Sequence, residues 1–306
     1  MDRSANNEAV VAELEEVWVS VNEACTGLTV AEWELPTACP GWTVRDQVSH
    51  LIGVEKTILG DPPPPSLDQE PSYIRNPFGA ANEAWIEARR TVPGDEVLAE
   101  LAEVSDRRLA SLRAMTTEAF DVVGWSPAGQ VPYREFMATR IMDIWAHEQD
   151  IRRAVGRPGG RNQAGERVSL ARCAQAMPFV VGKKVSPPEG TSVLFVVTGL
   201  LGFRLPVEVS DGRARVSDQP TDQPTVTITM DQELFCRLGF GRTDPVAHLD
   251  DGSVTVVGDV DLGRSVVSAT DSSRPISDPH ERRLWGLLIF LLISGTMISG
   301  RLHLNS

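Results

Sequence analysis

The sequence predicts two domains, an all-α helical bundle followed by a small α/β (α+β) domain, and three observations lead to this prediction. The chain has 306 residues, of which 42% are hydrophobic and 23% are charged, whereas a single hydrophobic core seldom grows beyond about 250 residues. Apolar side chains recur every three or four residues as far as about residue 186, which is the period of an amphipathic helix. From Thr191 onward, β-branched runs bounded by Gly, Asp and Pro replace that pattern and predict strands. The predicted ranges are 1–186 for the bundle, 187–270 for the α/β domain and 271–306 for an apolar tail.

The first two helices follow from periodicity and from an end signal. The segment "NEAVVAELEEVWVSVNEAC" has one apolar face and one acidic face. Thr43 is a good N-cap for a second helix, "VRDQVSHLIGVEKTIL", in which His50 lies toward the edge of the core-facing stripe. That stripe consists of Val44, Val48, Leu51 and Glu55.

The remaining helices of this domain are separated by a proline-rich segment. The prolines of 61–71 exclude a helix there, because proline lacks the backbone donor and restricts the residue before it. Helical periodicity resumes over 78–92 and again from Gly94. A last helix is predicted from about Tyr133 to Val155, before the glycine and proline stop signal "GRPGG".

The second domain is predicted as strands with two helices. The β-branched runs are "TSVLFVVTG", "FRLPVEVS" and "PTVTITM", and "DGR" at 211–213 is a turn between strands. An amphipathic helix, "DQELFCRLGFG", a further strand, "SVTVVGD", and a final helix near "VDLGRSVVSA" complete this α/β unit.

Charge and cysteine usage narrow the class of protein. The formal net charge of −13 opposes a phosphate backbone, and no basic run compensates for it, so the sequence argues against nucleic acid as a partner. The four cysteines form no C-x-x-C pair, and the N-terminal segment is acidic without an apolar signal core. These features predict a cytoplasmic protein with reduced thiols.

The segment 282–301 leaves three interpretations open. Its apolar run from Leu284 to Gly300 has 17 residues, at the lower end of the range of about 17 to 25 that spans a bilayer. It is a tail anchor, a packed C-terminal helix, or the product of an altered reading frame. The short length and the polar Ser294, Thr296 and Ser299 favour a segment outside the membrane.

The stretch "RIMDIWAHEQDIRR" at 140–153 carries the chemistry of the first domain. Arg140, Asp143, His147 and Asp150 follow at spacings of three, four and three, so they form one narrow polar stripe on a helix. The same side of the helix carries Phe136, Ile144, Ile151 and Ala154, and the opposite side carries Glu135, Gln149, Arg152 and Arg153. The polar stripe therefore faces the bundle interior, where its groups must pair with each other, with a metal ion or with water.

A metal site would need a third ligand beside Asp143 and His147, which lie one turn apart and can bind one ion together. His50 is the only other histidine in the helical half. A set of two histidines and a carboxylate leaves coordination positions open on zinc or a similar divalent ion, as a catalytic site requires. The residues alone also fit a satisfied salt-bridge network around Arg140, with His50 as an ordinary helix-face histidine.

Two long motifs resemble one known family. "PTACPGWTVRDQVSHLIGVE", followed about ninety residues later by "RIMDIWAHEQDIRRAVGRPGG", is similar to the mycothiol-dependent maleylpyruvate isomerase family, whose N-terminal domain is a DinB-like four-helix bundle. The second half, with "VTITMDQELFCRLGFGRTDP" and "VTVVGDVDLG", is similar to that family's C-terminal domain, an α/β unit related to sterol-carrier proteins. The resemblance covers roughly residues 8 to 268.

The resemblance implies residue roles. His50, Asp143 and His147 match the positions that bind a divalent metal, usually zinc, although the isomerase that gives the family its name has glutamate where this chain has Asp143. Arg242, in "LGFGR", matches the functional arginine of the C-terminal domain, which would bind a carboxylate or stabilise enolate charge. Arg140 either contacts substrate or pairs with Asp143 or Asp150, and Asp150 supports the ligands or the fold.

The implied activity is that of a metal-dependent, mycothiol-using isomerase or thiol transferase. In such an enzyme a small-molecule thiolate adds to an electrophilic substrate, which in some cases bears a carboxylate. The alternative is a protein of the same fold that binds a metal or a small molecule without turning it over. Cys39 is either reactive or a packing residue of its loop, and Trp42 and Trp145 are expected to be core anchors.

Overall fold

The computed structural model describes residues 3–74, 76–126, 129–161, 163–218 and 221–270, and these form two compact units. One unit ends at Glu166 and the other begins at Arg167, so most of helix α7 (Ala164–Phe179) groups with the second unit. The predicted boundary at 186–187 instead marks the point where helices give way to strands. The predicted tail, including the apolar run of 282–301, lies outside the described residues.

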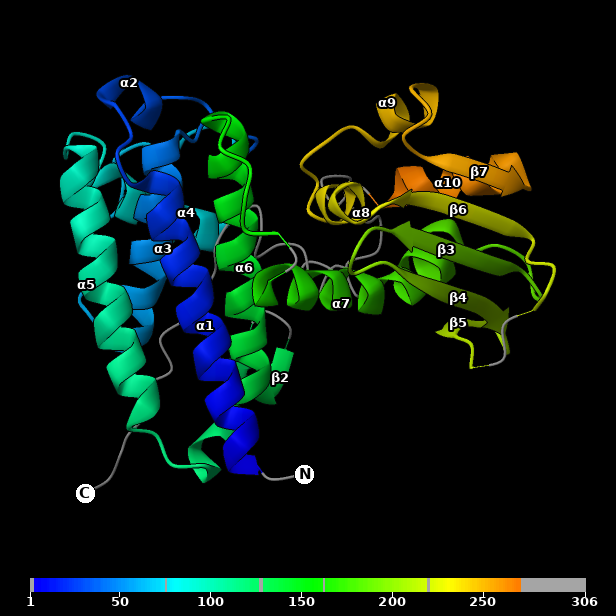
Figure 1. Ribbon diagram of the computed structural model, residues 1–306, viewed down its shortest axis with the longest axis horizontal. Helices are drawn as coiled ribbons and strands as arrows, with labels where there is room; N and C mark the ends of the chain where they lie inside the picture. Colours follow the sequence, from blue (N-terminus) through cyan, green and yellow to red (C-terminus); the bar gives the residue numbers. More distant parts are fainter. Residues whose placement is uncertain (1–2, 75, 127–128, 162, 219–220, 271–306) are drawn as a thin grey trace. The chain divides into compact units, whose positions relative to one another are not determined.

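The first unit is a bundle of four long helices, as predicted (Figure 1). Each helix packs against two others, in the cyclic order α1, α6, α3, α5. The long helices are α1 (Arg3–Cys25), α3 (Val44–Leu59), α5 (Gly94–Arg113) and α6 (Tyr133–Ala154). Shorter elements connect them: α2 (Val30–Trp33), α4 (Pro77–Glu87), η1 (Glu118–Asp121), and the hairpin of β1 (Val123–Ser126) and β2 (Gly129–Pro132). The helix predicted over 78–92 ends earlier, at Glu87, and the sequence analysis did not anticipate α2, the hairpin or α7.

Helix α3 begins and ends where its sequence signals predict. The Thr43 side chain accepts a hydrogen bond from the Asp46 backbone N–H, and the Asp46 side chain accepts one from Thr43 N–H, which is a reciprocal N-terminal cap. Gly60 ends the helix at a φ of 82°, a left-handed conformation that glycine adopts without steric cost. These two signals set where α3 begins and ends, and they place His50 within the helix.

The "CPGW" sequence before α3 forms a tight turn. The Trp42 N–H donates to the Cys39 carbonyl over 3.1 Å, and Gly41 has a φ of 80°, the pattern of a type II turn with Pro40 at its second position. The Tyr73 ring, from the non-helical segment after the prolines, lies so close that a Cβ on Gly41 would meet it at 2.3 Å. The turn thus holds Cys39 and Trp42 beside the bundle interior, where both are buried.

The second unit contains a five-stranded sheet in the order β5-β4-β3-β6-β7. Only β3 and β6 pair in parallel, and the other neighbours are antiparallel. The strands are β3 (Ser192–Thr198), β4 (Phe203–Ser210), β5 (Arg213–Val216), β6 (Val226–Asp231) and β7 (Thr255–Gly258). The helical elements beside α7 are η2 (Val180–Val185), α8 (Gln232–Gly239), α9 (Pro245–Asp250) and α10 (Val260–Ala269). The predicted strands, α8 and α10 are confirmed.

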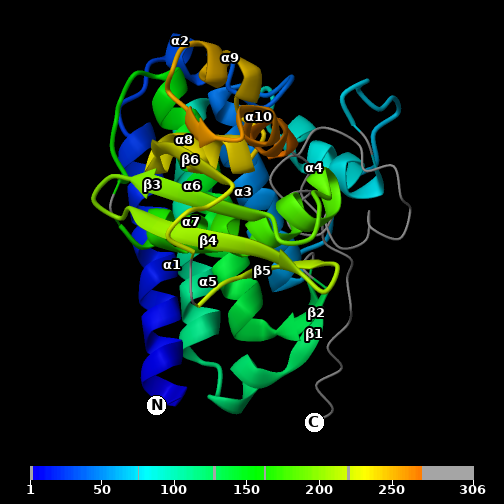
Figure 2. The ribbon, with the colours of Figure 1, turned by 90° about the vertical axis from the view of Figure 1, so that its right-hand side faces the viewer.

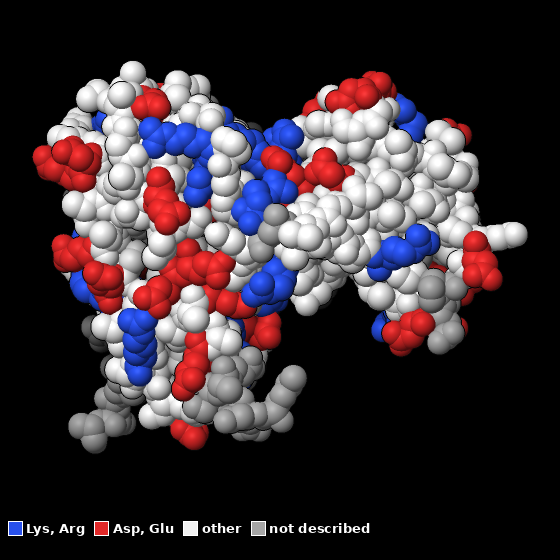
Figure 3. Space-filling model, viewed as in Figure 1, with Lys and Arg blue, Asp and Glu red and all other residues white. Residues whose placement is uncertain are grey.

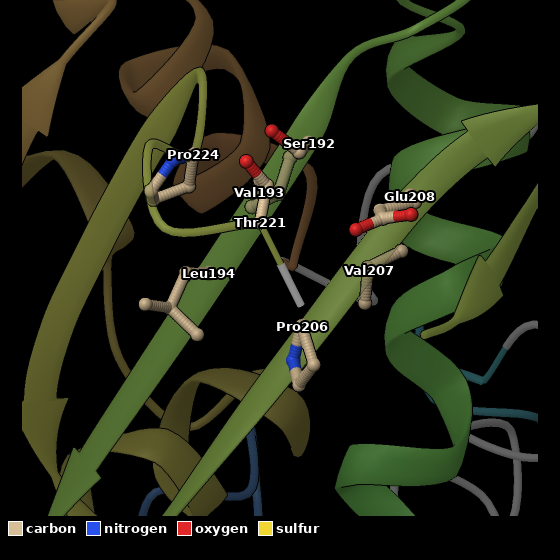
Figure 4. A pocket seen from close by; sticks show the side chains of 8 residues that line it. All are labelled: Ser192, Val193, Leu194, Pro206, Val207, Glu208, Thr221 and Pro224. Carbon is tan, nitrogen blue, oxygen red and sulfur yellow. The ribbon is translucent and has the colours of Figure 1, made fainter. Parts of the chain in front are cut away.

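The two faces of this sheet differ (Figure 2). Alternate side chains such as Val193, Phe195 and Ile228 are buried on one face, and α8 and α10 contact the sheet. On the other face a shallow pocket of about 190 Å³ lies between β3, β4 and the loop before β6 (Figure 4). Its lining is mostly apolar or hydroxylic and has one ionisable side chain, Glu208. It therefore lacks the set of ligating groups that a cation requires.

Acidic side chains are spread over the bundle on the face shown in Figure 3, with smaller basic groups between them. Within the part of the chain that the structure describes, no helix combines the length and apolar character needed to cross a membrane. All four cysteines are buried and have free thiols, in agreement with their spacing in the sequence.

Candidate metal centre

The whole polar stripe that the sequence predicts on helix α6 is buried inside the bundle. Arg140, Asp143, His147 and Asp150 are each 3% exposed or less. The opposite side of the helix is not solvated either, because Gln149 and Arg152 are also buried. Glu148 and Arg152 pair there and contact Ser20 of α1. A helical wheel locates the stripe but does not show that the bundle and its loops enclose α6 on both sides.

Three side chains from α3 and α6 converge inside the bundle. Asp143 Oδ2 lies 3.6 Å from His50 Nε2, and Asp143 Oδ1 lies 3.6 Å from His147 Nε2. The two imidazole rings are 4.6 Å apart between centroids. Zinc bonds of about 2.0 to 2.2 Å in a tetrahedral site separate neighbouring ligand atoms by roughly 3.3 to 3.6 Å. One ligand atom from each of the three residues lies within 4.8 Å of the others, so small movements would bring them to the spacing that one such ion imposes.

The hydrogen-bond inventory of these residues tests whether a cation fits. His50 Nδ1 and Nε2, Asp143 Oδ1 and His147 Nε2 are all buried and have no hydrogen-bond partner. A buried polar atom without a partner costs about 1 to 3 kcal/mol. Three of these atoms, one from each residue (His50 Nε2, Asp143 Oδ1 and His147 Nε2), are explained by one group that accepts their lone pairs. A divalent cation, bound through two imidazoles and one carboxylate oxygen, has that property.

Arg140 fixes the orientation of the Asp143 carboxylate. Its Nη1 donates to Asp143 Oδ2 over 2.6 Å, while its Nε and Nη2 donate to Glu55 Oε1 over 3.0 and 2.8 Å. Arg108 Nε donates to the other Glu55 oxygen over 3.0 Å, and Arg108 Nη2 donates to the Tyr133 hydroxyl. Of the alternatives for Arg140, the structure shows the pair with Asp143; Asp150 instead lies 3.5 Å from Arg153.

Gln47 orients His147. The His147 Nδ1–H donates to Gln47 Oε1, and Gln47 Nε2 in turn donates to the Thr37 hydroxyl over 2.6 Å. A hydrogen on Nδ1 leaves the Nε2 lone pair directed at Asp143 and His50, which is how partners of metal-binding histidines commonly act. The sequence analysis missed Gln47, although its position three residues before His50 places both on one side of α3.

Burial and charge shift the two histidines in opposite directions. Burial, and then the neighbouring His147, lower the pKa of His50 to about 4, so its ring is neutral at pH 7. Burial also opposes charge on His147, but the Asp143 carboxylate raises the pKa of this imidazole to about 9. Burial disfavours the charged form of Asp143, yet Arg140 and His147 hold the pKa of its carboxyl well below the usual range. The Nε2 position of His147 thus carries a positive charge, as a proton or as a bound cation.

A pocket of about 390 Å³ lies beside these residues and is lined by the "CPGW" turn, the segment after the prolines and α4. The lining residues are Cys39, Pro40, Trp42, Tyr73, Ile74, Gly79 and Glu83. The Trp42 ring lies 5.1 Å from the His50 ring and 5.9 Å from the His147 ring. Trp42 is therefore the wall shared by the pocket and the histidines. The buried Glu83 carboxylate accepts hydrogen bonds from the Trp42 and Tyr73 side chains and pairs with Arg90.

Arg242 lies in the second unit, just after α8. It is 9% exposed, its backbone N–H donates to the Arg237 carbonyl over 2.9 Å, and its Nη1 donates to the Phe240 carbonyl over 3.3 Å. These contacts hold the chain in place just after α8.

Comparisons with known proteins agree with this architecture. Residues 14–152 match the profile of the mycothiol maleylpyruvate isomerase N-terminal domain, and residues 177–271 match that of the SCP-2 sterol transfer family. No curated protein sequence matches the chain.

Two crystal structures share the fold. One is of a mycothiol-dependent maleylpyruvate isomerase, at 18% identity and a TM-score of 0.51, and the other is of a histidine-to-alanine mutant of such an isomerase, at 16% and 0.52. Each comparison covers 83% of this chain and 94% of the other. The two profiles match successive parts of the chain, a mycothiol maleylpyruvate isomerase N-terminal domain followed by an SCP-2 domain, and the chain shares its fold with both crystal structures.

Proposed function

We propose that the protein is a metal-dependent, mycothiol-using enzyme, an isomerase or a thiol transferase, in which a small-molecule thiolate adds to an electrophilic substrate. The observation that carries the proposal is the group of three buried ligand atoms without hydrogen-bond partners, His50 Nε2, Asp143 Oδ1 and His147 Nε2. The match of residues 14–152 to the mycothiol maleylpyruvate isomerase N-terminal domain and the fold shared with mycothiol-dependent maleylpyruvate isomerase support it.

The three residues would hold the cation through His50 Nε2, Asp143 Oδ1 and His147 Nε2. Zinc suits two imidazoles and one carboxylate, and three protein ligands leave a position open for an exchangeable group. When bound, the cation supplies positive charge that keeps a thiol in its nucleophilic thiolate form at neutral pH. Gln47 and Arg140 keep the ligand atoms aimed at that position.

The buried charges around the site leave the cation's charge available to substrate. Glu55 and Asp143 carry two negative charges, and Arg108 and Arg140 carry two positive charges, so these four groups cancel. The imidazole of His50 is neutral because of its lowered pKa. A divalent cation here is therefore not neutralised by its surroundings, and it favours anionic ligands such as a thiolate or a substrate carboxylate.

The pocket beside Trp42 gives the electrophile a place to bind. Trp42, Tyr73 and Ile74 offer apolar surface, while Glu83 is already engaged in three interactions. We assign the carboxylate of the substrate, or the enolate charge that develops on thiol addition, to Arg242, whose planar guanidinium suits a carboxylate. The cytoplasm, where mycothiol would be present as the free thiol, is the proposed compartment.

The decisive experiment is a turnover screen of metal-loaded protein against activated alkenes, including maleylpyruvate, with mycothiol, with glutathione and without thiol. Thiol-dependent turnover that disappears on chelation is expected. Metal binding without turnover of any electrophile would instead support the alternative, a protein that binds a metal or a small molecule without catalysis.

Arg242→Ala tests the arginine separately. The variant should keep its metal and lose about 100-fold in thiol-dependent turnover, the usual scale for one charge-stabilising group. Arg242→Lys should recover only part of the loss, because an ammonium retains the charge but not the two-pronged geometry. Arg213→Ala, at an exposed arginine of the same unit, is the control. Wild-type turnover in Arg242→Ala would remove the arginine from the mechanism.

A further inference from the structure

Cys39 belongs to a second group of ligand atoms that the proposed reaction does not use. Cys39 Sγ lies 3.5 Å from Asp150 Oδ2, and the same oxygen lies 4.0 Å from His147 Nδ1. One ligand atom from each of these three buried residues lies within 4.8 Å of the others. The group therefore adjoins the first one and shares His147 with it, on the opposite ring nitrogen.

The spacing and the donor types fit a thiophilic cation. Metal–sulfur bonds of about 2.3 Å and metal–oxygen or metal–nitrogen bonds of about 2.0 to 2.1 Å place tetrahedral ligand atoms roughly 3.3 to 3.6 Å apart. The separation of Cys39 Sγ from Asp150 Oδ2 already has that value. The 4.0 Å between Asp150 Oδ2 and His147 Nδ1 needs to close by roughly 0.6 Å. A set of one sulfur, one nitrogen and one oxygen selects Zn²⁺-like ions and excludes Mg²⁺ and Ca²⁺, which prefer oxygen ligands.

The surroundings orient Asp150 and provide a path for the ion. Arg153 Nη1 lies 3.5 Å from Asp150 Oδ1, so Oδ2 is the oxygen that faces Cys39 and His147. Arg140 holds Asp143 in the same way, engaging one oxygen and directing the other at a histidine. Cys39 also lines the 390 Å³ pocket, so an ion in that pocket reaches Sγ without passing the first group.

We propose that Cys39, His147 and Asp150 form a second binding position for a thiophilic divalent cation, such as Cd²⁺ or Zn²⁺ in excess, and that it excludes the ion of the first position. The exclusion rests on the proposed metal site at His50, Asp143 and His147, whereas the second position itself does not. On binding, the Cys39 thiol releases its proton to solvent, and the metal–sulfur bond replaces the S–H bond.

His147 makes the two positions exclusive. A neutral imidazole carries one proton, and the contact with Gln47 places it on Nδ1. An ion at Nδ1 displaces the Gln47 contact and moves that proton to Nε2, which removes the lone pair that the first position needs. The second position therefore acts as an inhibitory site for soft metal ions.

A titration of metal-free, full-length protein with Cd²⁺ tests the second position through the ultraviolet charge-transfer band of a cadmium–thiolate bond. Wild type should show one such bond per chain, and Cys39→Ser should lose the band. Cys25→Ser is the matched control, because Cys25 is a buried thiol of the same unit whose electrostatic neighbours are Glu148 and Arg152. The proposal is overturned if wild type shows no such band or if Cys39→Ser keeps it. Loss of the band in Cys25→Ser would overturn the proposal as well.

Two further variants separate this proposal from the proposed function. His50→Gln removes a ligand of the first position only, so it should keep the cadmium–thiolate band; loss of the band would contradict the assignment. Asp150→Asn should weaken Cd²⁺ binding about 10- to 100-fold, and unchanged affinity would overturn the role of Asp150. This variant also keeps the test valid if Cys39→Ser fails to fold, which circular dichroism would show.

Exclusion is tested on zinc-loaded protein with a colorimetric chelator that reports released Zn²⁺. Cys39→Ser should need at least about tenfold more Cd²⁺ than wild type to release the same Zn²⁺. Equal concentrations in the two proteins would show that Cd²⁺ enters the first position directly, and would overturn the exclusion.

Discussion

Glu55 and Asp143 are two buried carboxylates on either side of the same guanidinium, and they differ in how their oxygens are used. Glu55 accepts three hydrogen bonds, two from Arg140 and one from Arg108, so both of its oxygens are engaged. Asp143 accepts one from Arg140 on Oδ2, and its Oδ1 has no partner. The first arrangement is that of a structural ion pair, and the second keeps one oxygen available for a ligand.

Within the network around Arg140, Glu55 therefore mainly stabilises the fold, and Asp143 is available to bind a ligand. Removing one partner of a buried ion pair is costly because it leaves a buried charge uncompensated. Asp143 has one hydrogen bond to Arg140 and attracts the nearby His147 imidazole, whose pKa it raises, so it is less tightly bound into the network than Glu55. Substitutions of Glu55 should therefore mainly lower the stability of the fold, and substitutions of Asp143 should mainly lower the affinity for the metal ion.

The largest effect is expected for His147→Ala. Loss of a shared ligand should reduce occupancy from about one divalent ion per chain to almost none, an affinity loss of more than about 100-fold. Metal content after desalting measures it, with circular dichroism as the check on folding. His248→Ala, in the second unit, should retain the metal, since His248 bonds to Thr243 and Ser253. Full occupancy in His147→Ala would eliminate the site.

Glu55→Gln and Asp143→Asn test the difference between the two carboxylates directly. In the metal-free protein, Glu55→Gln should lower the free energy of unfolding by about 3 to 5 kcal/mol, because Arg108 and Arg140 lose their shared anion. Asp143→Asn should cost roughly 1 to 2 kcal/mol, since Arg140 keeps Glu55, yet it should weaken metal binding strongly. Urea unfolding and metal titration measure the two quantities. An equal loss of stability in the two variants would mean that Asp143 is as structural as Glu55.

Gln47→Ala should weaken metal binding about 10- to 100-fold without removing a ligand, because the His147 ring loses the partner that fixes its protonated nitrogen. Competition with a chelator of known affinity measures the change. Gln149→Ala is the control on the opposite side of α6, where that amide donates to the Gly159 carbonyl. Wild-type affinity in Gln47→Ala would show that packing alone orients His147.

The pH dependence of metal affinity is the smallest effect when it is taken per pH unit. Because the pKa of His147 is raised to about 9, this ring carries a proton at neutral pH that the incoming ion must displace. Apparent affinity should rise about tenfold per pH unit from pH 6 to 8 and level off near pH 9. His50, with its pKa lowered to about 4, adds no second proton in this range. Isothermal titration at several pH values measures the slope, and a flat profile would contradict the proton on His147.

The sequence by itself determined the order of the four long helices, the N-cap of α3 at Thr43, the predicted strands of the second domain and the inward polar stripe of α6. These are local properties, since periodicity, capping and turn chemistry act over a few residues. The same reasoning selected His50, Asp143 and His147 as candidates, because ligand chemistry limits which residue types can bind a metal ion. The role of Arg242 came from resemblance alone and stays a prediction.

Only the tertiary structure decided what each of these side chains contacts. Glu55 was one member of an apolar stripe in the sequence, and it became the anion of two buried arginines. Gln47 and Cys39 carried no signal for a metal site, yet they contact His147 and Asp150, about one hundred residues further along the chain. Such contacts depend on how α3 rotates against α6 and where the "CPGW" turn sets its side chains. No local pattern encodes that rotation, because it results from the packing of the whole bundle.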